Sequence, residues 1–141
     1  MSTENLIIDG SFAEELVHWR TSSPEYVTIV HNPPGDNYAK IAVGNATGLT
    51  QVVPRAAGDY TLTFRSCYVG PNCSVRVWGQ NQSGGWEFII FPNMPVNYNQ
   101  NIWNTNTFNF NVAEKYTEFK VEFYASYQTT FMFTNVSVTK Q

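Results

Sequence analysis

Charged side chains are scarce in this chain of 141 residues. Asp, Glu, Lys and Arg make up only 13% of it, which is about half the share found in an ordinary globular domain. The eight basic residues are scattered, and the formal net charge is -3. Nucleic-acid binding normally depends on a basic patch that neutralises phosphates, so we expect no nucleic-acid partner. Binding to anionic membrane surfaces is disfavoured for the same reason.

Long hydrophobic runs are also absent. No stretch approaches the roughly 18 apolar residues of a membrane span, so we expect no membrane insertion. The first residues, Met1–Asn5, lack the basic region and apolar block of a signal peptide. The location therefore stays open between a cytoplasmic protein, an unconventionally exported one and a fragment of a larger secreted chain. Extracellular or cell-surface action is compatible with the last two.

Cysteine is limited to Cys67 and Cys73, which flank a turn-like segment at 68–72. A short cross-hairpin disulfide and a pair of free thiols are both compatible with this spacing. The two histidines, His18 and His31, lie too far from these cysteines to form a recognisable zinc motif.

Helix signals are nearly absent, and the one candidate, Ala13–Val17, is about one turn long and expected to be loop. Short runs of alternating apolar and polar residues recur instead, separated by Gly, Pro and Asn. The expected strands are Tyr26–Val30, Tyr38–Val43, Leu49–Val53, Tyr60–Cys67, Ser74–Gln80, Trp86–Phe91, Thr105–Val112, Glu118–Ala125 and Phe131–Thr139. Nine or ten short strands without interleaved helices predict one all-β domain over residues 1–141, an antiparallel β-sandwich or jelly roll.

The alternation also predicts which residues face the core. Tyr60, Leu62 and Phe64 share one face of their strand, while Arg65 and Cys67 belong to the other face. The remaining inward sets are expected to be Phe108, Phe110 and Val112; Phe119, Val121 and Phe123; and Phe131, Phe133, Val136 and Val138.

The opening Asn5–Phe12, followed by Trp19, resembles the N-terminal signature of the xylan- and glucan-binding carbohydrate-binding modules. The resemblance continues, in the family's order and spacing, through Ala39–Val43, Gly48–Val53, Gly58–Phe64, Trp103 with Phe108–Phe110, and Phe133–Val138. It covers nearly the whole chain and implies a galactose-binding-like jelly roll that binds carbohydrate.

The chain departs from this family at its structural calcium site. The resemblance implies acidic ligands after the Phe and before the final Asn-Val, where this sequence has Ala13 and Thr134. Glu14 and Glu15 remain as displaced ligands, but calcium needs six to eight oxygens and no compact acidic cluster supplies them. The sequence therefore predicts no definite cofactor, and a structural calcium ion stays open.

Motifs for catalysis are missing. The sequence has no Gly-x-Ser-x-Gly elbow, no His-Glu-x-x-His and no phosphate-binding glycine loop. One carboxylate pair, Glu87 with Glu122 across a sheet face, offers the arrangement of a glycoside hydrolase. The alternative, which we favour, is that both are solvated or sugar-contacting strand residues, so we expect no enzyme.

Positive signals for binding come from amides, hydroxyls and aromatic rings, which suit neutral, hydroxyl-rich ligands. In Ser74–Gln80 we expect Val75 to face the core and Arg76, Trp78 and Gln80 to project together from the other face. A ring offers a large contact at low entropic cost, and the polar groups can hydrogen-bond hydroxyls. The alternative packs Trp78 in the core, but it would bury Arg76 at a high cost.

Four further residues complete the predicted site, while Trp19 and Trp103 match family positions that look structural and are left out. Trp86 either borders the same face or caps the core. The full set of predicted ligand-binding residues is Arg65, Arg76, Trp78, Gln80, Trp86, Glu122 and Tyr124.

The sequence therefore predicts non-catalytic, lectin-like binding of a neutral oligosaccharide or polysaccharide. The alternative is a protein-interaction module, such as an adhesin, receptor-binding or coat component, that uses the same sandwich. An exposed aromatic face serves either role, and a homo-oligomer stays open.

Overall fold

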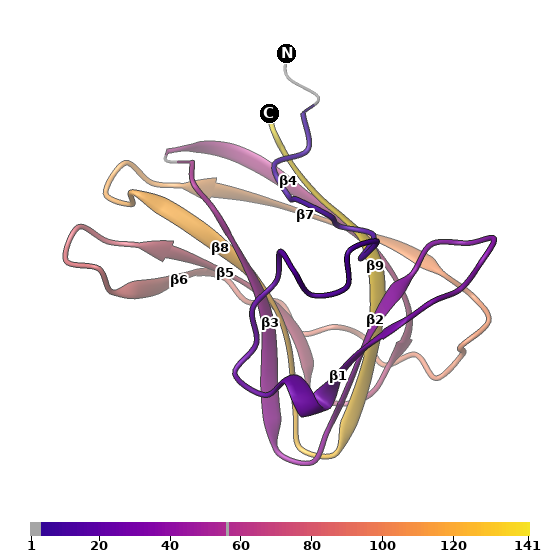
Figure 1. Cartoon of the computed structure of the whole chain (residues 1–141). Coiled ribbons are helices and arrows are strands. Elements are labelled where there is room, and N and C mark those ends of the chain that lie inside the picture. Colours follow the sequence, from indigo (N-terminus) through magenta and orange to yellow (C-terminus); the bar gives the residue numbers. More distant parts are fainter. Residues whose placement is uncertain (1–3, 56) are drawn as a thin grey trace.

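A computed structural model describes residues 4–55 and 57–141 as two antiparallel β-sheets packed face to face (Figure 1). Part of the segment considered for a signal peptide, residues 1–3, lies outside these ranges. The described elements are a 3₁₀ turn, η1 (Pro24–Tyr26), and nine strands: β1 (Val27–Val30), β2 (Tyr38–Val43), β3 (Ala46–Val53), β4 (Gly58–Val69), β5 (Cys73–Gln80), β6 (Trp86–Ile90), β7 (Asn104–Val112), β8 (Glu118–Ser126) and β9 (Thr129–Lys140). In the described part of the chain, no helix is long and apolar enough to cross a membrane.

The strands form one five-stranded and one four-stranded sheet. The first has the order β1-β2-β9-β4-β7 and the second the order β3-β8-β5-β6, and every paired neighbour is antiparallel. Successive strands often belong to different sheets, as when the chain leaves β4 and enters β5. This architecture confirms the predicted all-β sandwich of the jelly-roll type.

The core lies between the two sheets and is rich in aromatic rings. Phe123 from one sheet stacks on Phe133 from the other, with ring centroids 4.0 Å apart. The predicted inward sets are buried, with one exception: Phe108 on the edge strand β7 is only partly buried. Such close aromatic packing between facing sheets is a large part of what stabilises a sandwich of this size.

Cys67 is a second departure from the predicted pattern, because it belongs to the outward face of β4 and is nevertheless 1% exposed. The β4–β9 register shifts between Ser66 and Val69, and the segment around Asn97 pairs with Val69. The Asn97 amide also donates to the Cys67 carbonyl oxygen at 2.8 Å. A bulge and a distant loop thus cover this position, and neither is visible in the local alternation.

The two cysteines are free and buried. A cross-hairpin disulfide does not form, because β4 and β5 belong to different sheets and are not cross-strand neighbours. The Cys67 thiol lies 3.9 Å from the Met132 sulfur, while the Cys73 thiol contacts Thr129 Oγ1 at 3.9 Å. Burial raises the pKa of both thiols, that of Cys73 to about 11.

The N-terminal segment folds as a series of tight turns against the sandwich, and Ala13–Val17 is not helical, as expected. The Asp9 carboxylate accepts the backbone N–H of Ala13 at 2.8 Å. The Trp19 indole donates to the Asp9 carbonyl oxygen at 3.1 Å, and its ring is 4% exposed. Trp19 is therefore structural. Gly10 allows the close approach of this segment to β9, because a Cβ there would lie 2.0 Å from the Val136 carbonyl oxygen.

Candidate functional site

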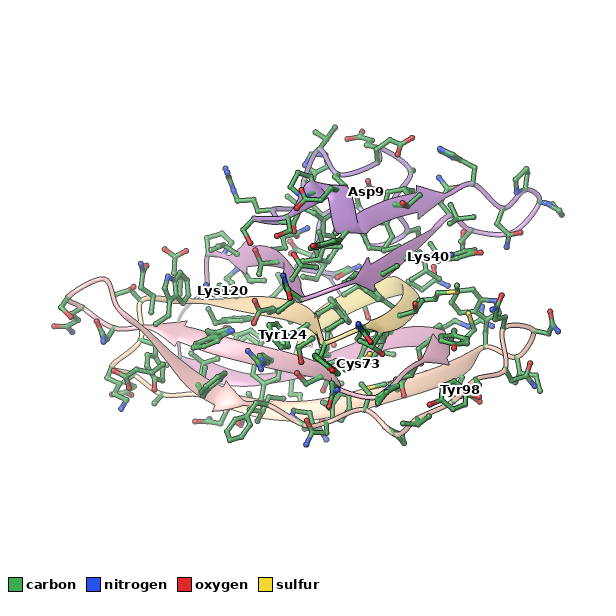
Figure 2. All side chains as sticks on the ribbon, turned by 90° about the horizontal axis from the view of Figure 1, so that it is seen from below. Asp9, Lys40, Cys73, Tyr98, Lys120 and Tyr124 are labelled. Carbon is green, nitrogen blue, oxygen red and sulfur yellow. The ribbon has the colours of Figure 1, made fainter. Side chains whose placement is uncertain are left out.

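Six of the seven predicted ligand-binding residues meet on the solvent side of the four-stranded sheet, which we call the outer face. In the register of β5 and β8, Arg76 lies opposite Glu122 and Trp78 lies opposite Lys120. Val75 and Val77 are fully buried on the other side of β5. The predicted orientation of β5 is therefore confirmed. Figure 2 labels Lys120 and Tyr124, two of the β8 residues that share this face.

Arg76 is held against two β8 residues. Its guanidinium carbon lies 3.7 Å from the centroid of the Tyr124 ring, and its Nη1 lies 3.8 Å from Glu122 Oε1. Its Nε donates to Ser74 Oγ at 3.3 Å. The side chains of Arg76 and Glu122 are only 26% and 16% exposed. The guanidinium is thus fixed in one orientation before any ligand arrives.

Trp78 is fixed by the same carboxylate. Its indole Nε1 donates to Glu122 Oε1 at 3.0 Å. One side of its ring is stacked on Phe88 of β6, with centroids 3.9 Å apart. Trp78 and Phe88 therefore present a joint aromatic surface. Phe88 was not predicted, although its spacing of two residues from Trp86 placed it on the same strand face.

Lys120 connects the two tryptophans of the outer face. Its Nζ lies 4.4 Å from the Trp86 ring centroid and 5.5 Å from that of Trp78. Trp86 lies opposite Gln80 in the register of β5 and β6, so it borders the outer face. The Gln80 amide donates to the carbonyl oxygen of Gly84 at 3.2 Å and ties down the loop between these strands.

A hollow of ≈ 400 Å³ opens beside Glu122, between β3 and the N-terminal segment. Its lining residues are Arg20, Thr21, Ser22, Gly48, Thr50 and Glu122. Arg20 and Thr50 exchange backbone hydrogen bonds of 2.9 and 2.8 Å. Gly48 leaves room for Glu122, since a Cβ on it would lie 2.2 Å from the Glu122 carboxylate. Local sequence could not reveal this hollow, because it depends on the pairing of segments 30 residues apart.

Arg65 does not join the outer face. It lies on β4 in the other sheet, opposite Thr105 of β7 and Thr134 of β9. Its guanidinium carbon lies 5.8 Å from the Trp103 ring centroid. Trp103 was expected to be structural. Its ring contacts the Tyr38 ring, which agrees with a structural role. The Trp103 side chain is only partly buried, however, and it lines a second hollow together with Arg65.

Glu87 does not pair with Glu122 across one face. Glu87 lies opposite Gly79, and Gly79 lies opposite the fully buried Phe119. Glu87 therefore points to the other side of the sheet from Glu122. There it accepts hydrogen bonds from Asn81 at 2.9 Å and from the Tyr116 hydroxyl at 3.1 Å. The hydrolase arrangement considered for Glu87 and Glu122 is wrong.

The positions of the family's calcium ligands are occupied by ordinary hydrogen bonds. The Thr134 hydroxyl donates to the Asn37 carbonyl oxygen at 2.5 Å. Glu14 and Glu15, the displaced candidates, face His18 and His31 at 2.5 and 2.8 Å. Among residues 4–55 and 57–141, no group of three or more His, Cys, Asp or Glu is placed to hold a metal ion.

Comparison with solved structures identifies many proteins with this fold. A family 16 carbohydrate-binding module has a TM-score of 0.73 at 16% identity, over 96% of this chain and 100% of the module. A family 61 carbohydrate-binding module in complex with β-1,4-galactotriose has a TM-score of 0.69 at 14% identity, over 99% of this chain and 100% of the module. The enzymatically active domain of tailspike protein 4 from bacteriophage CBA120 has a TM-score of 0.76 at 16% identity.

The alignment with the tailspike covers 97% of this chain but only 21% of the tailspike domain. The sequence matches no protein-family model. No curated protein matches it either. The fold is therefore that of the jelly-roll carbohydrate-binding modules, as the resemblance implied, and at these identities the comparison establishes the fold alone.

Proposed function

We propose that this protein binds neutral glycans without catalysis, on the outer face of the four-stranded sheet. The observation that carries the proposal is the array in which Glu122 Oε1 accepts the Trp78 indole and faces the Arg76 guanidinium, which itself lies on Tyr124. This array is preorganised, so little side-chain entropy remains to be lost on binding. The jelly-roll neighbour that holds β-1,4-galactotriose supports the same ligand class.

The outer face combines the two kinds of contact that a sugar ring requires. The joint surface of Trp78 and Phe88 provides an apolar platform, while Gln80, Arg76 and Glu122 provide donors and acceptors for hydroxyl groups. The face extends from Trp86 on β6, across β5 and β8, to the hollow beside Glu122. This extent suits several sugar units of an oligosaccharide or polysaccharide.

The charge pair at the centre of the outer face suits a neutral ligand. Arg76 and Glu122 compensate each other at 3.8 Å, and the Lys120 ammonium group lies over the Trp86 ring. An acidic polysaccharide would meet the Glu122 carboxylate at the centre of the face, and a cationic one would meet Arg76. A neutral hydroxyl group, in contrast, can accept a hydrogen bond from Arg76 and donate one to Glu122.

The proposal includes no chemical step. Glycoside hydrolysis canonically uses two carboxyl groups that flank the scissile bond at a defined separation, and Glu87 lies on the other side of the sheet from Glu122. The family 16 and family 61 neighbours are binding modules. The tailspike neighbour is an enzymatically active domain, but the part of it that aligns with this chain is only 21% of its length.

The test is a glycan array together with insoluble polysaccharides, with calcium and with chelator. We expect saturable binding to neutral glycans that Trp78→Ala weakens at least about tenfold, as loss of a stacking aromatic would. Tyr98→Ala is the matched control, since Tyr98 is 61% exposed and lies outside the outer face. Unchanged affinity of a folded Trp78→Ala variant would refute the assignment.

A clean negative across the whole screen would instead favour the protein-interaction alternative. Its first measurement is the molar mass in solution, by size-exclusion chromatography with light scattering. A stable homo-oligomer that buries the outer face would support this alternative.

A further inference from the structure

We propose that the five-stranded sheet carries a second, independent pocket that binds a single neutral sugar ring. The pocket has a volume of ≈ 180 Å³ and is lined by Asn32, Gly35, Asp36, Arg65, Trp103 and Thr134. These residues come from the β1–β2 loop, β4, the position just before β7, and β9. The pocket and the outer face lie on different sheets, so this inference goes beyond the proposed function and does not depend on it.

The aromatic wall of the pocket is Trp103. Its indole makes an edge-to-face contact with Tyr38 of β2, with centroids 5.3 Å apart and the ring planes at 66°. The Arg65 guanidinium carbon lies 5.8 Å from the Trp103 centroid. Contacts from two other strands thus hold the indole while it still lines the hollow. A half-buried ring fixed in this way provides a stacking surface for a sugar ring.

The polar wall combines the guanidinium of Arg65 with the carboxylate of Asp36. Arg65 and Asp36 are both exposed side chains. Within residues 4–55 and 57–141, no hydrogen bond or ion pair is made by the Asp36 carboxylate or by the Arg65 guanidinium. Arg76 and Glu122 on the outer face, in contrast, already contact each other. The hydrogen-bonding capacity of Arg65 and Asp36 is therefore available to a ligand.

The size of the pocket suits one sugar ring. A volume of ≈ 180 Å³ is smaller than the roughly 300–1,000 Å³ of pockets for drug-sized ligands. The charge balance selects a neutral ligand, because Asp36 opposes an anion and Arg65 opposes a cation. A polyol with both donors and acceptors satisfies the two groups at once. These properties together describe a monosaccharide or the terminal unit of a glycan.

The tryptophan indole signals allow the pocket to be tested in the full chain. The protein has four tryptophans, which give four indole N–H signals in a ¹H–¹⁵N spectrum, assignable by Trp→Phe variants. D-galactose, D-glucose and D-xylose are titrated separately, with D-glucuronate as the anionic probe. We expect at least one neutral sugar to shift the Trp103 signal saturably. No shift with any neutral sugar, or a saturable shift with glucuronate alone, would overturn the proposal.

Substitutions of the exposed residues Arg65 and Asp36 distinguish binding in this pocket from binding on the outer face. Arg65→Ala and Asp36→Asn should each raise the Kd measured at Trp103 about tenfold, since each removes a charged hydrogen-bonding group. The other three indole signals should stay in place and show that both variants are folded. Trp78→Ala should leave the Kd at Trp103 unchanged. If the outer face does not bind glycan, the Trp78 and Trp86 signals will not shift when a glycan is added, whatever happens at Trp103. If the Kd measured at Trp103 is unchanged in both Arg65→Ala and Asp36→Asn, the proposal of the second pocket is refuted.

Discussion

The indole of Trp78 and the carboxylate of Glu122 are joined by a 3.0 Å hydrogen bond between neighbouring antiparallel strands. The same carboxylate oxygen lies 3.8 Å from Arg76 Nη1. Glu122 therefore determines the orientation of both side chains that we assign to ligand contact. It acts on the site by positioning these groups as well as by offering an acceptor.

Replacement of Glu122 by Ala should weaken glycan binding and lower the free energy of unfolding by about 1.5–3 kcal/mol, the range for a hydrogen bond to a charged group. Glu122→Gln keeps an acceptor for the Trp78 indole, so it should retain more of the glycan affinity and more of the free energy of unfolding than Glu122→Ala does. Urea denaturation and calorimetric titration measure the two effects. If Glu122→Ala binds glycan as the unchanged protein does, Glu122 has no positioning role.

Gly48 lies opposite Tyr124 on β8 and next to the Glu122 side chain, and a methyl group there should act mainly on the site. A Cβ at Gly48 would lie 2.2 Å from the Glu122 carboxylate, which is the flexible end of a side chain and can move away. We expect Gly48→Ala to reduce glycan affinity several-fold and to cost no more stability than Glu122→Ala, because the displaced carboxylate can at most lose its hydrogen bond to Trp78.

Gly10 offers the matched contrast. Its Cβ would lie 2.0 Å from the Val136 carbonyl oxygen, which is backbone and cannot yield cheaply. Gly10→Ala should therefore cost several-fold more stability than Gly48→Ala. The comparison of the two urea midpoints checks this, and equal midpoints would contradict it.

The thiol of Cys73 should resist alkylation and should make stability fall in alkaline solution. Burial raises its folded-state pKa from 9.0 to about 11, so the folded state holds the proton more tightly than the unfolded state does. The stabilising contribution is complete below about pH 9 and is lost as the pH rises to about 11. Iodoacetamide labelling at pH 8, with and without denaturant, measures access to the thiol.

A Cys73→Ala variant is the control for the pH dependence. It should lose part of the decline in stability between pH 9 and pH 11. The raised pKa values of Cys67 and Tyr60, which also result from burial, account for a remaining decline in the same direction. Rapid labelling of Cys73 in the native protein would contradict its burial.

Glu87 should titrate below the ordinary range of a glutamate. Its pKa is lowered from 4.5, first by the Asn81 hydrogen bond and then by those from Lys115 and Tyr116. Its stabilising contribution is thus present above about pH 4.5 and is lost as the pH falls through the lower folded-state value. A carboxyl-detected NMR titration gives the midpoint, and Asn81→Ala should return it toward 4.5. A midpoint at or above 4.5 in the unchanged protein would disprove the network.

The strands could be predicted from sequence because alternation is a local signal. Each of the nine expected strands is present, and β2 (Tyr38–Val43) has the predicted bounds. The orientation of β5 was also predictable, since the opposite arrangement would bury Arg76 without compensation. In these cases the chemistry of one strand is enough to decide the outcome.

Other features required contacts between distant segments and could not be predicted. Arg65 was included in the predicted site because it faces away from the inward residues of its strand, but alternation does not say to which sheet a strand belongs. Cys67 was assigned to the outward face of its strand, but it is buried. The β4–β9 register shifts next to it, and the loop around Asn97 packs beside it. Phe88 became a neighbour of Trp78 only through the pairing of β5 with β6.

The last strand of the chain, β9, lies in the interior of the five-stranded sheet between β2 and β4 (Figure 1). Leu6 donates its backbone N–H to the Val138 carbonyl oxygen at 2.8 Å, so β9 also anchors the beginning of the described chain. During synthesis β2 and β4 have no partner between them until residues 129–140 leave the ribosome. Because most of its strand pairings join distant segments, the protein should fold slowly and only after translation of β9 is complete.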